Sequence, residues 1–267
     1  MTKLANHLAV YKLLPKTNCR QCDAATCLAF AVAVMQGNKR LSDCPFLQDY
    51  DSVEIKDIRR EGPSLEDDTR RALGELQGRV RKTDLAAAAE RVGGAYGQGK
   101  LTIKCLGKDF HVDQDGVITS GCHVNMWVSA PILQYVLGSA GRKPVGQWVP
   151  LRETKGGADW RRLFGQRCEK PLKKVIDDYT GLMEDLVHIF AGKPAPASFD
   201  SDIAVVIHPL PKLPMLLCYW KKDEGMDSSL HMFFDVTAED NLNVESIYTL
   251  SVGLVTMFQK IALTHGK

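Results

Sequence analysis

The stretch "NCRQCDAATCLAFAVAVMQGNKRLSDCP", from Asn18 to Pro45, holds four of the eight cysteines in the chain. The four are spaced as C-x2-C-x4-C-x16-C at Cys19, Cys22, Cys27 and Cys44, and a proline follows the last one. Three close thiols and one distant thiol are typical of iron–sulfur sites, in which a compact loop covers one side of the cluster and a later segment closes it. Structural zinc usually takes its ligands from two pairs of closely spaced cysteines or histidines, and the fourth cysteine here belongs to no such pair. The spacing therefore favours iron–sulfur over zinc.

The residues between the third and fourth cysteines predict a helix. The segment "LAFAVAVM" is helical in composition, and Gly37 is a suitable C-terminal cap. A helix that starts at Cys27 directs its first N–H groups, and the positive end of its dipole, toward anionic sulfur. Cys19 and Cys22 lie among polar residues, which is not the pattern of a core strand. We therefore interpret the four cysteines as metal ligands rather than as core residues.

Composition sets wider limits on the protein. A chain of 267 residues with 45% hydrophobic side chains can bury a full core, so we expect one small module and one larger domain. A net charge of +2 argues against a general polyanion-binding surface, and nucleic acid is not an expected partner. The first residues do not resemble a signal peptide, and no uncharged apolar run approaches the length of a membrane span, so we expect a cytoplasmic protein without one. Disulfides are rare in the cytoplasm, where clustered cysteines more often bind metal.

Residues 13–47 resemble a known type of small domain. The leading "LPKTNC", the x4 and x16 gaps and the "DCP" ending are similar to the four-iron cluster domain of corrinoid iron–sulfur protein large subunits and of the B subunit of the Rnf electron-transport complex. Relatives usually have glycine after the first and second cysteines, where this chain has Arg20 and Asp23. The resemblance implies one [4Fe-4S] cluster on the four cysteines and a place in anaerobic redox metabolism.

The rest of the chain predicts an α+β fold with a mainly antiparallel sheet. We expect a hairpin in "LTIKCLGKDFHVDQDGVIT" around Gly107-Lys108, a tight turn at Asp115-Gly116, and three late strands in "IAVVIHPL", "PMLLCYWK" and "HMFFDVT". The expected helices cover residues 65–81, 85–92, 126–137, 169–191 and 243–263. The predicted organisation is a helical iron–sulfur module at 1–47, a connector and helix at 48–80, and an α+β domain of unknown function at 81–267.

The larger domain also resembles a known family. From about residue 80, "WVPLRETKGG", "PLPKLPMLLCYWKKDEG" and "FFDVTAEDNL" are similar to an uncharacterised bacterial and archaeal domain family, some members of which carry the same cluster domain in front. This resemblance implies a fold but no activity.

The four remaining cysteines divide into two pairs. Cys105 and Cys218 lie in apolar strand segments and are interpreted as buried small hydrophobes. Cys122 lies beside His123 in the polar segment "SGCHVN", and Cys168 lies in the basic segment "RRLFGQRCEKPLKK"; both settings favour a thiolate or a metal ligand. Cys122, His123 and Cys168 are therefore the candidate catalytic residues, with a structural role as the alternative for each cysteine.

Carboxylates give a weaker signal. Asp177, Asp178, Glu184 and Asp185 lie on the predicted helix 169–191 and are interpreted as its solvated face.

Three functions remain open from the sequence. The leading one is a redox protein whose cluster passes electrons to or from a site in, or docked on, the larger domain. The second is a redox enzyme with a site near Cys122, His123 and Cys168, which leaves room for a second cofactor, a corrinoid or another. The third is an assembly or binding protein with a structural cluster.

Charge suggests a partner. Residues 1–47 carry six basic and two acidic residues. Lys16, Arg20, Lys39 and Arg40 either balance an anionic cluster or steer an acidic ferredoxin or a redox enzyme toward it.

Overall fold

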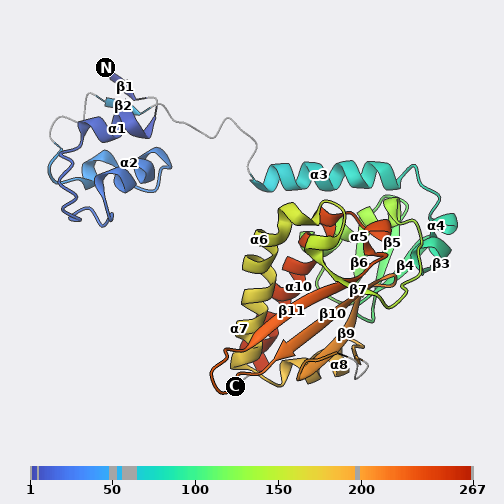
Figure 1. The fold of residues 1–267 in the computed structure, drawn as a ribbon. Coiled ribbons are helices and arrows are strands. Elements are labelled where there is room, and N and C mark those ends of the chain that lie inside the picture. The colour runs from blue at the N-terminus through green and yellow to red at the C-terminus, as the bar shows by residue number, and fades with distance from the viewer. Residues whose placement is uncertain (1, 5, 48–52, 56–64, 196–198, 266–267) are drawn as a thin grey trace. The chain divides into compact units, whose positions relative to one another are not determined.

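The computed structural model describes residues 2–4, 6–47, 53–55, 65–195 and 199–265 (Figure 1). The chain divides into two compact units, Met1–Asp68 and Thr69–Lys267. The predicted fold class is confirmed, because a small helical N-terminal module is followed by a larger α+β unit with antiparallel sheets. Much of the predicted connector, residues 48–52 and 56–64, lies outside the described residues.

The N-terminal unit is built on two short helices. α1 (His7–Leu13) is capped by the side chain of Asn6, which accepts a hydrogen bond from the Ala9 N–H at 2.9 Å. α2 (Cys27–Met35) ends two residues before Gly37, whose φ of 75° terminates the helix as predicted. The remaining elements of this unit are the parallel pair β1 (Thr2–Leu4) and β2 (Val53–Ile55) and the 3-10 turn η1 (Leu41–Asp43). Its core consists of Val10, Leu14, Cys27, Phe30, Ala31, Val34, Leu41 and Cys44.

The larger unit contains two antiparallel sheets. The four-stranded sheet has the order β3 (Ala95–Gly97), β4 (Lys100–Cys105), β5 (Lys108–Asp113) and β6 (Ile118–Ser120). The five-stranded sheet has the order β7 (Trp148–Pro150), β11 (Ser229–Asp235), β10 (Leu213–Trp220), β9 (Ile203–Leu210) and β8 (Lys193–Pro194). The Leu106 N–H donates to the His208 carbonyl oxygen at 3.0 Å and so joins the β4–β5 hairpin to β9.

The hairpin is confirmed one residue earlier than predicted. Its two-residue loop is Leu106-Gly107, with φ values of 48° and 75°. Positive φ at both central positions matches the twist of an antiparallel pair, which is why such loops use glycine.

Helices pack against these sheets and against one another (Figure 1). α7 contacts β11, α8 contacts β9, and α10 contacts both α5 and α7. The helices are α3 (Leu65–Val80), α4 (Leu85–Val92), α5 (Met126–Gly138), α6 (Arg161–Phe164), α7 (Lys170–Asp178), α8 (Leu182–Ile189), α9 (Ala238–Asn241) and α10 (Val244–His265). The shorter helical turns are η3 (Leu151–Glu153), η4 (Gly157–Trp160) and the π-helical turn η5 (Gly165–Glu169).

The single helix predicted over residues 169–191 is wrong. The chain leaves the helix at Tyr179, where φ is −137° and ψ is 86°, and α8 begins three residues later. The Tyr179 hydroxyl donates to Asp185 Oδ2 at 2.6 Å across this break. Apolar periodicity continues through the break because α7 and α8 both bury apolar residues, so the sequence pattern did not reveal it.

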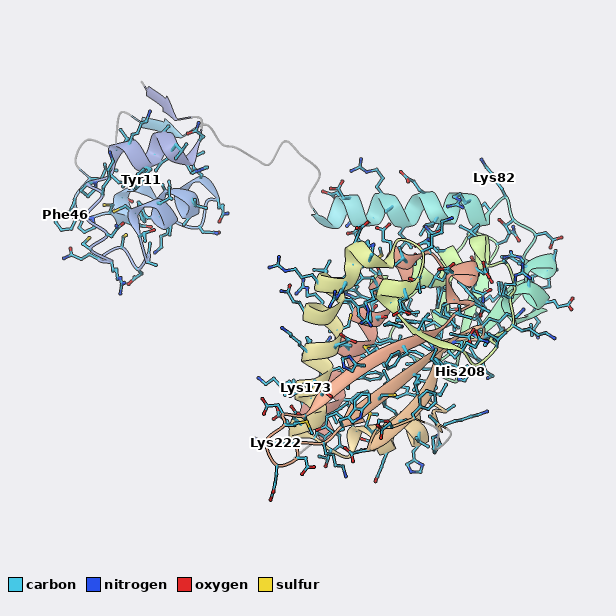
Figure 2. All side chains as sticks on the ribbon, viewed as in Figure 1. Tyr11, Phe46, Lys82, Lys173, His208 and Lys222 are labelled. Carbon is cyan, nitrogen blue, oxygen red and sulfur yellow. The ribbon has the colours of Figure 1, made fainter. Side chains whose placement is uncertain are left out.

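Asp177 and Asp178 consequently lie on α7, and Glu184 and Asp185 on α8, so the four do not form one face of a single helix. Asp177, near the end of α7, accepts hydrogen bonds at 2.7 Å from the hydroxyls of Tyr219 and Ser228 and from Lys173 Nζ. These hydrogen bonds to Asp177 join α7 to the β10–β11 hairpin. Lys173, labelled in Figure 2, lies on α7.

A buried carboxylate organises one edge of the five-stranded sheet. Asp235 is fully buried and accepts hydrogen bonds from the Val145 N–H at 3.0 Å, the Gly146 N–H at 2.6 Å and the Thr237 hydroxyl at 2.7 Å. Burial alone would raise the pKa of this carboxyl, but the hydrogen bonds outweigh burial and lower the pKa.

One described helix, α10, is long and apolar enough to cross a membrane by length and composition alone. Ile247, Leu254 and Phe258 of this helix are buried in the core of the larger unit. A core helix of a folded domain passes the same test of length and composition.

Candidate metal centre

The four cysteines of the N-terminal unit line one cavity. Cys27 and Cys44 are buried, Cys22 is partly exposed and Cys19 is exposed. The other residues of the cavity wall are Leu14, Pro15, Asn18, Arg20, Ala24, Thr26 and Phe30. Four thiols that share one cavity are the donor set that holds iron–sulfur clusters.

The third cysteine begins α2. Thr26 is the N-cap, and its hydroxyl accepts a hydrogen bond from the Ala29 N–H at 3.1 Å. The Asn18 side chain reaches across the loop and accepts from the Cys27 N–H at 2.8 Å. The positive end of the α2 dipole therefore lies at the cysteine cavity, where it favours negative charge.

The loop around the first two cysteines uses an unusual backbone. Lys16, Asn18, Arg20 and Asp23 have φ values of 60°, 51°, 62° and 53°. An L-residue pays a steric cost in this left-handed region, which glycine avoids. Arg20 and Asp23 directly follow Cys19 and Cys22, so the two positions where the chain departs from the expected glycines are left-handed.

The surroundings of the first cysteine lower the pKa of its thiol. The Gln21 backbone N–H and then the Thr17 side chain are the main causes that lower the pKa of Cys19. Both groups stabilise the thiolate, which is the form that binds metal.

The fourth cysteine follows η1. The Arg40 N–H donates to Asp43 Oδ2 at 2.8 Å and the Cys44 N–H donates to the Leu41 carbonyl oxygen at 3.1 Å, so this turn is held from both ends. Phe46, labelled in Figure 2, comes two residues later and is 52% exposed. An exposed aromatic side chain close in sequence to Cys44 is available to a partner surface.

The four predicted steering residues differ in position. Arg20 lines the cysteine cavity, and Lys16 lies with Nζ 5.6 Å from the centre of the Tyr11 ring. Lys16, Arg20 and Arg40 are exposed and Lys39 is partly exposed.

Within the described residues, no group of three or more His, Cys, Asp or Glu side chains is placed to hold a single metal ion, and this includes the four cysteines of the cavity.

The prediction of a thiolate at Cys168 is wrong. Cys168 lies in η5 and is fully buried in the core of the larger unit. Burial raises the pKa of its thiol to about 12, and the neighbouring Arg167 lowers it by less. The basic sequence around Cys168 belongs to exposed side chains, whereas Cys168 itself faces the core.

Cys122 and His123 are exposed and line a cavity of the larger unit that also contains Cys105. Cys105 is 4% exposed, and burial first, then the proximity of Cys122, raises the pKa of its thiol to about 12. The structure therefore brings Cys122 together with Cys105 rather than with Cys168. Cys218 is buried, as its apolar strand predicted.

Sequence reasoning missed the other residues of this cavity. Lys108 of β5, Asn125 and Trp127 at the start of α5, and Lys260 of α10 line it with Cys122. The hairpin pairs Cys105 with Lys108 on the same face, which the alternation of β4 and β5 indicates. Packing of α10 on α5 has no signal in the sequence.

Two family models match the chain. The model described as "Domain of unknown function (DUF3786)" matches residues 84–257, and the model described as "Putative Fe-S cluster" matches residues 14–46. Both predicted resemblances are confirmed. The N-terminal unit thus contains an iron–sulfur cluster domain.

Curated relatives match the N-terminal part. The gamma subunit of the acetyl-CoA decarbonylase/synthase complex from Methanothermobacter thermautotrophicus is 41% identical over 49 residues, which are 18% of this chain and 11% of the relative. The corrinoid/iron-sulfur protein large subunit of Moorella thermoacetica is 48% identical over 42 residues, 16% of this chain and 9% of the relative. The chain therefore spans about a tenth of the length of these relatives. No solved structure is significantly similar to the chain.

Proposed function

Because this chain belongs to the family described as Domain of unknown function (DUF3786) and carries an iron–sulfur cluster domain in front, we propose that it is an electron-transfer protein of that family. Its N-terminal unit would hold one [4Fe-4S] cluster and pass electrons to or from a site in, or docked on, the larger unit. The observation that carries the proposal is that Cys19, Cys22, Cys27 and Cys44 line a single cavity.

Two of the proposed ligands are supported by local contacts. Cys27 is held at the start of α2 through the Asn18 side chain, and Cys44 is held by the closed turn η1. A bound cluster of this type supplies one-electron oxidation and reduction. Polar groups near a ligand sulfur stabilise added negative charge, so the Gln21 backbone and the Thr17 side chain, which lower the pKa of Cys19, would help to set the potential.

Exposure favours electron exchange over a purely structural cluster. Cys19 is exposed, whereas Cys27 and Cys44 are buried, so electrons would enter or leave on the Cys19 side. Arg20 lies on that side, and exposed positive charge attracts an acidic redox partner. The matched relatives are named as a subunit of the acetyl-CoA decarbonylase/synthase complex and as a corrinoid/iron-sulfur protein, which supports a redox enzyme complex as the partner class here. An acidic ferredoxin is proposed from the positive charge alone.

A redox titration of the full chain, purified anaerobically, tests the proposal. We expect a reversible one-electron transition in the visible spectrum and a paramagnetic signal on reduction. Cys27→Ser and Cys44→Ser should remove both signals, because each deletes a buried ligand. Cys218→Ser, a buried cysteine of the larger unit, is the matched control and should keep them.

Two results would count against the proposal. A cluster that binds in the expected ratio but shows no reversible transition would indicate a structural role. Loss of the signals in Cys218→Ser but not in Cys44→Ser would show that the ligand assignment is wrong.

A further inference from the structure

One continuous helical segment, residues 161–178, lies at the surface of the larger unit. α6, η5 and α7 follow one another in it without a break, and the π-helical turn η5 lies in its middle. The face that packs into the core is formed by residues four apart, Phe164, Cys168, Leu172 and Ile176. π-helical turns inside α-helices are frequent at functional sites.

The opposite face of this segment is basic. Residues 161–176 include six basic residues and one acidic residue. Arg162, Lys170 and Lys174 each lie two positions from a residue of the buried face, which is about 200° around a helix. Lys170 and Lys174 are neighbours at i, i+4, where Cβ atoms are about 5–6 Å apart. Figure 2 shows nitrogen-tipped side chains along the outer side of α6 and α7.

These charges are not balanced within the described part of the chain. Lys173 pairs with Asp177 at 2.7 Å. The one acidic residue, Glu169, turns to β11 and accepts a hydrogen bond from the Met232 N–H at 3.3 Å. The exposed basic side chains that have no ion-pair partner among the described residues are called the basic stripe here: Arg161, Arg162, Arg167, Lys170 and Lys174.

The charges of the segment oppose the helix dipole. Arg161 and Arg162 begin the segment, at the positive end of the dipole, and Asp177 and Asp178 end it, at the negative end. Like charges at i, i+4 in the stripe lower helix stability further. Natural sequences accept such local costs mainly at functional sites, so the basic stripe is more than a solvated helix face.

The limits of the stripe indicate the class of partner. From Arg161 to Lys174 the segment is about 20 Å long at 1.5 Å per residue. The exposed carboxylates of Asp159 and Asp178 lie beyond its two ends, so a long polyanion such as nucleic acid would run from the stripe into like charge. Leu163, next to Arg162, is 41% exposed and offers an apolar contact of the kind found in protein interfaces.

From these features we infer that the basic stripe is a docking surface for an acidic protein. Asp and Glu side chains of that partner pair with the stripe, and an apolar side chain of the partner contacts Leu163. Arginine suits this role because its guanidinium binds a carboxylate through two parallel hydrogen bonds. The inference concerns only residues of the larger unit and does not depend on the cluster.

Binding of a labelled random copolymer of glutamate and tyrosine to the full chain tests this inference. Fluorescence anisotropy should show saturable binding at low salt, which weakens as the Debye length falls from about 10 Å at 0.1 M to about 3 Å at 1 M. Neutralising the stripe with Arg162→Gln, Arg167→Gln, Lys170→Gln and Lys174→Gln together should weaken binding about tenfold or more.

A matched control removes four positive charges elsewhere on the larger unit. Lys82, Lys100, Lys143 and Lys222 are exposed and lie outside the stripe. Their combined replacement by glutamine changes the net charge equally and should keep the wild-type affinity. Equal losses of affinity in the stripe and control variants would overturn the inference, because net charge alone would then explain binding.

Thermal unfolding separates lost binding from lost folding. The stripe variant removes like-charge repulsion and charges that oppose the helix dipole, so its Tm should equal or exceed that of the wild type. A Tm well below that of the wild type would show that the stripe stabilises the fold, and would overturn its interpretation as a docking surface.

Three further measurements identify the surface and the class of partner. Leu163→Ser should weaken binding of the copolymer but not of polyglutamate, which has no apolar side chain; equal effects on both polymers would overturn the role of Leu163. Carbodiimide coupling should join the copolymer to Lys170 and Lys174, as mapped by peptide mass spectrometry, and coupling confined to the N-terminal unit would overturn the inference. A DNA duplex that displaces the copolymer at equal concentration of charge would assign the stripe to nucleic acid instead.

Discussion

Replacement of Arg20 by glycine tests whether the cysteine loop is strained. Arg20 has φ of 62°, a conformation that costs an L-residue about 1–2 kcal/mol. Glycine removes that cost but adds about 0.5–1 kcal/mol of unfolded-state entropy. The balance predicts that Arg20→Gly stabilises the loop by about 0.5–1 kcal/mol. Asp23, with φ of 53°, should respond less, because aspartate tolerates the left-handed region better.

The assay is the rate of cluster loss from the full chain in denaturant, followed by visible absorbance. If strain is released when the loop opens, Arg20→Gly should slow the loss by about two- to fivefold. Arg20→Ala is the matched control, since it also removes the charge but keeps a Cβ on the left-handed residue. Equal rates for the glycine and alanine variants would refute the reasoning, because charge alone would then explain the effect.

Three further predictions concern stability and partners. Asp235→Asn should lower the free energy of unfolding on the order of 3 kcal/mol in urea titrations, because its donors lose a charged acceptor. The folded-state pKa of Asp235 is lowered, so its contribution to the free energy of unfolding is complete above the unfolded pKa of about 3.9 and is lost as pH falls through the folded value. If wild type and variant lost stability in parallel on acidification, this reasoning would be contradicted. Gly253→Ala should destabilise the larger unit by about 1–3 kcal/mol in thermal unfolding, because the added Cβ meets Trp127; a rise in Tm would show that the helices separate freely. Arg20→Glu with Lys39→Glu should slow reduction by an acidic ferredoxin at low salt and have little effect at high salt, and equal rates at low salt would leave these residues as counter-ions of the cluster.

Local signals predicted much of the fold. α4 was predicted at its observed bounds from an alanine-rich segment. The structure shows why it has those bounds, because Asp84 accepts from the Ala86 and Ala87 N–H groups at its start and Gly93 ends it with φ of 69°. β9, β10 and β11 were predicted from short apolar segments between turn residues. Such signals are carried by a few neighbouring residues and so can be read from one sequence.

Features that depend on distant packing were not predictable. The apolar pattern continues on both sides of the break between α7 and α8, so periodicity alone predicted one helix. Cys168 has basic neighbours in sequence but faces the core, and burial decides its pKa. Cys105 and Cys122 share a cavity only because α5 and α10 close over the β4–β5 hairpin.

At the candidate metal centre, too, one feature was predictable from the sequence and another was not. Spacing predicted the four cysteines as ligands, and the structure places all four on one cavity. The left-handed conformations at Arg20 and Asp23 were not predicted, because neither residue type requires them.

The central claim is one [4Fe-4S] cluster on Cys19, Cys22, Cys27 and Cys44, and metal analysis tests it most directly. Protein produced anaerobically with iron supplied should contain iron and acid-labile sulfide at about four of each per chain. Cys44→Ala should lose both, whereas Cys122→Ser, which changes an exposed cysteine of the larger unit, should keep both. Stoichiometric zinc without sulfide in the wild-type chain would contradict the account.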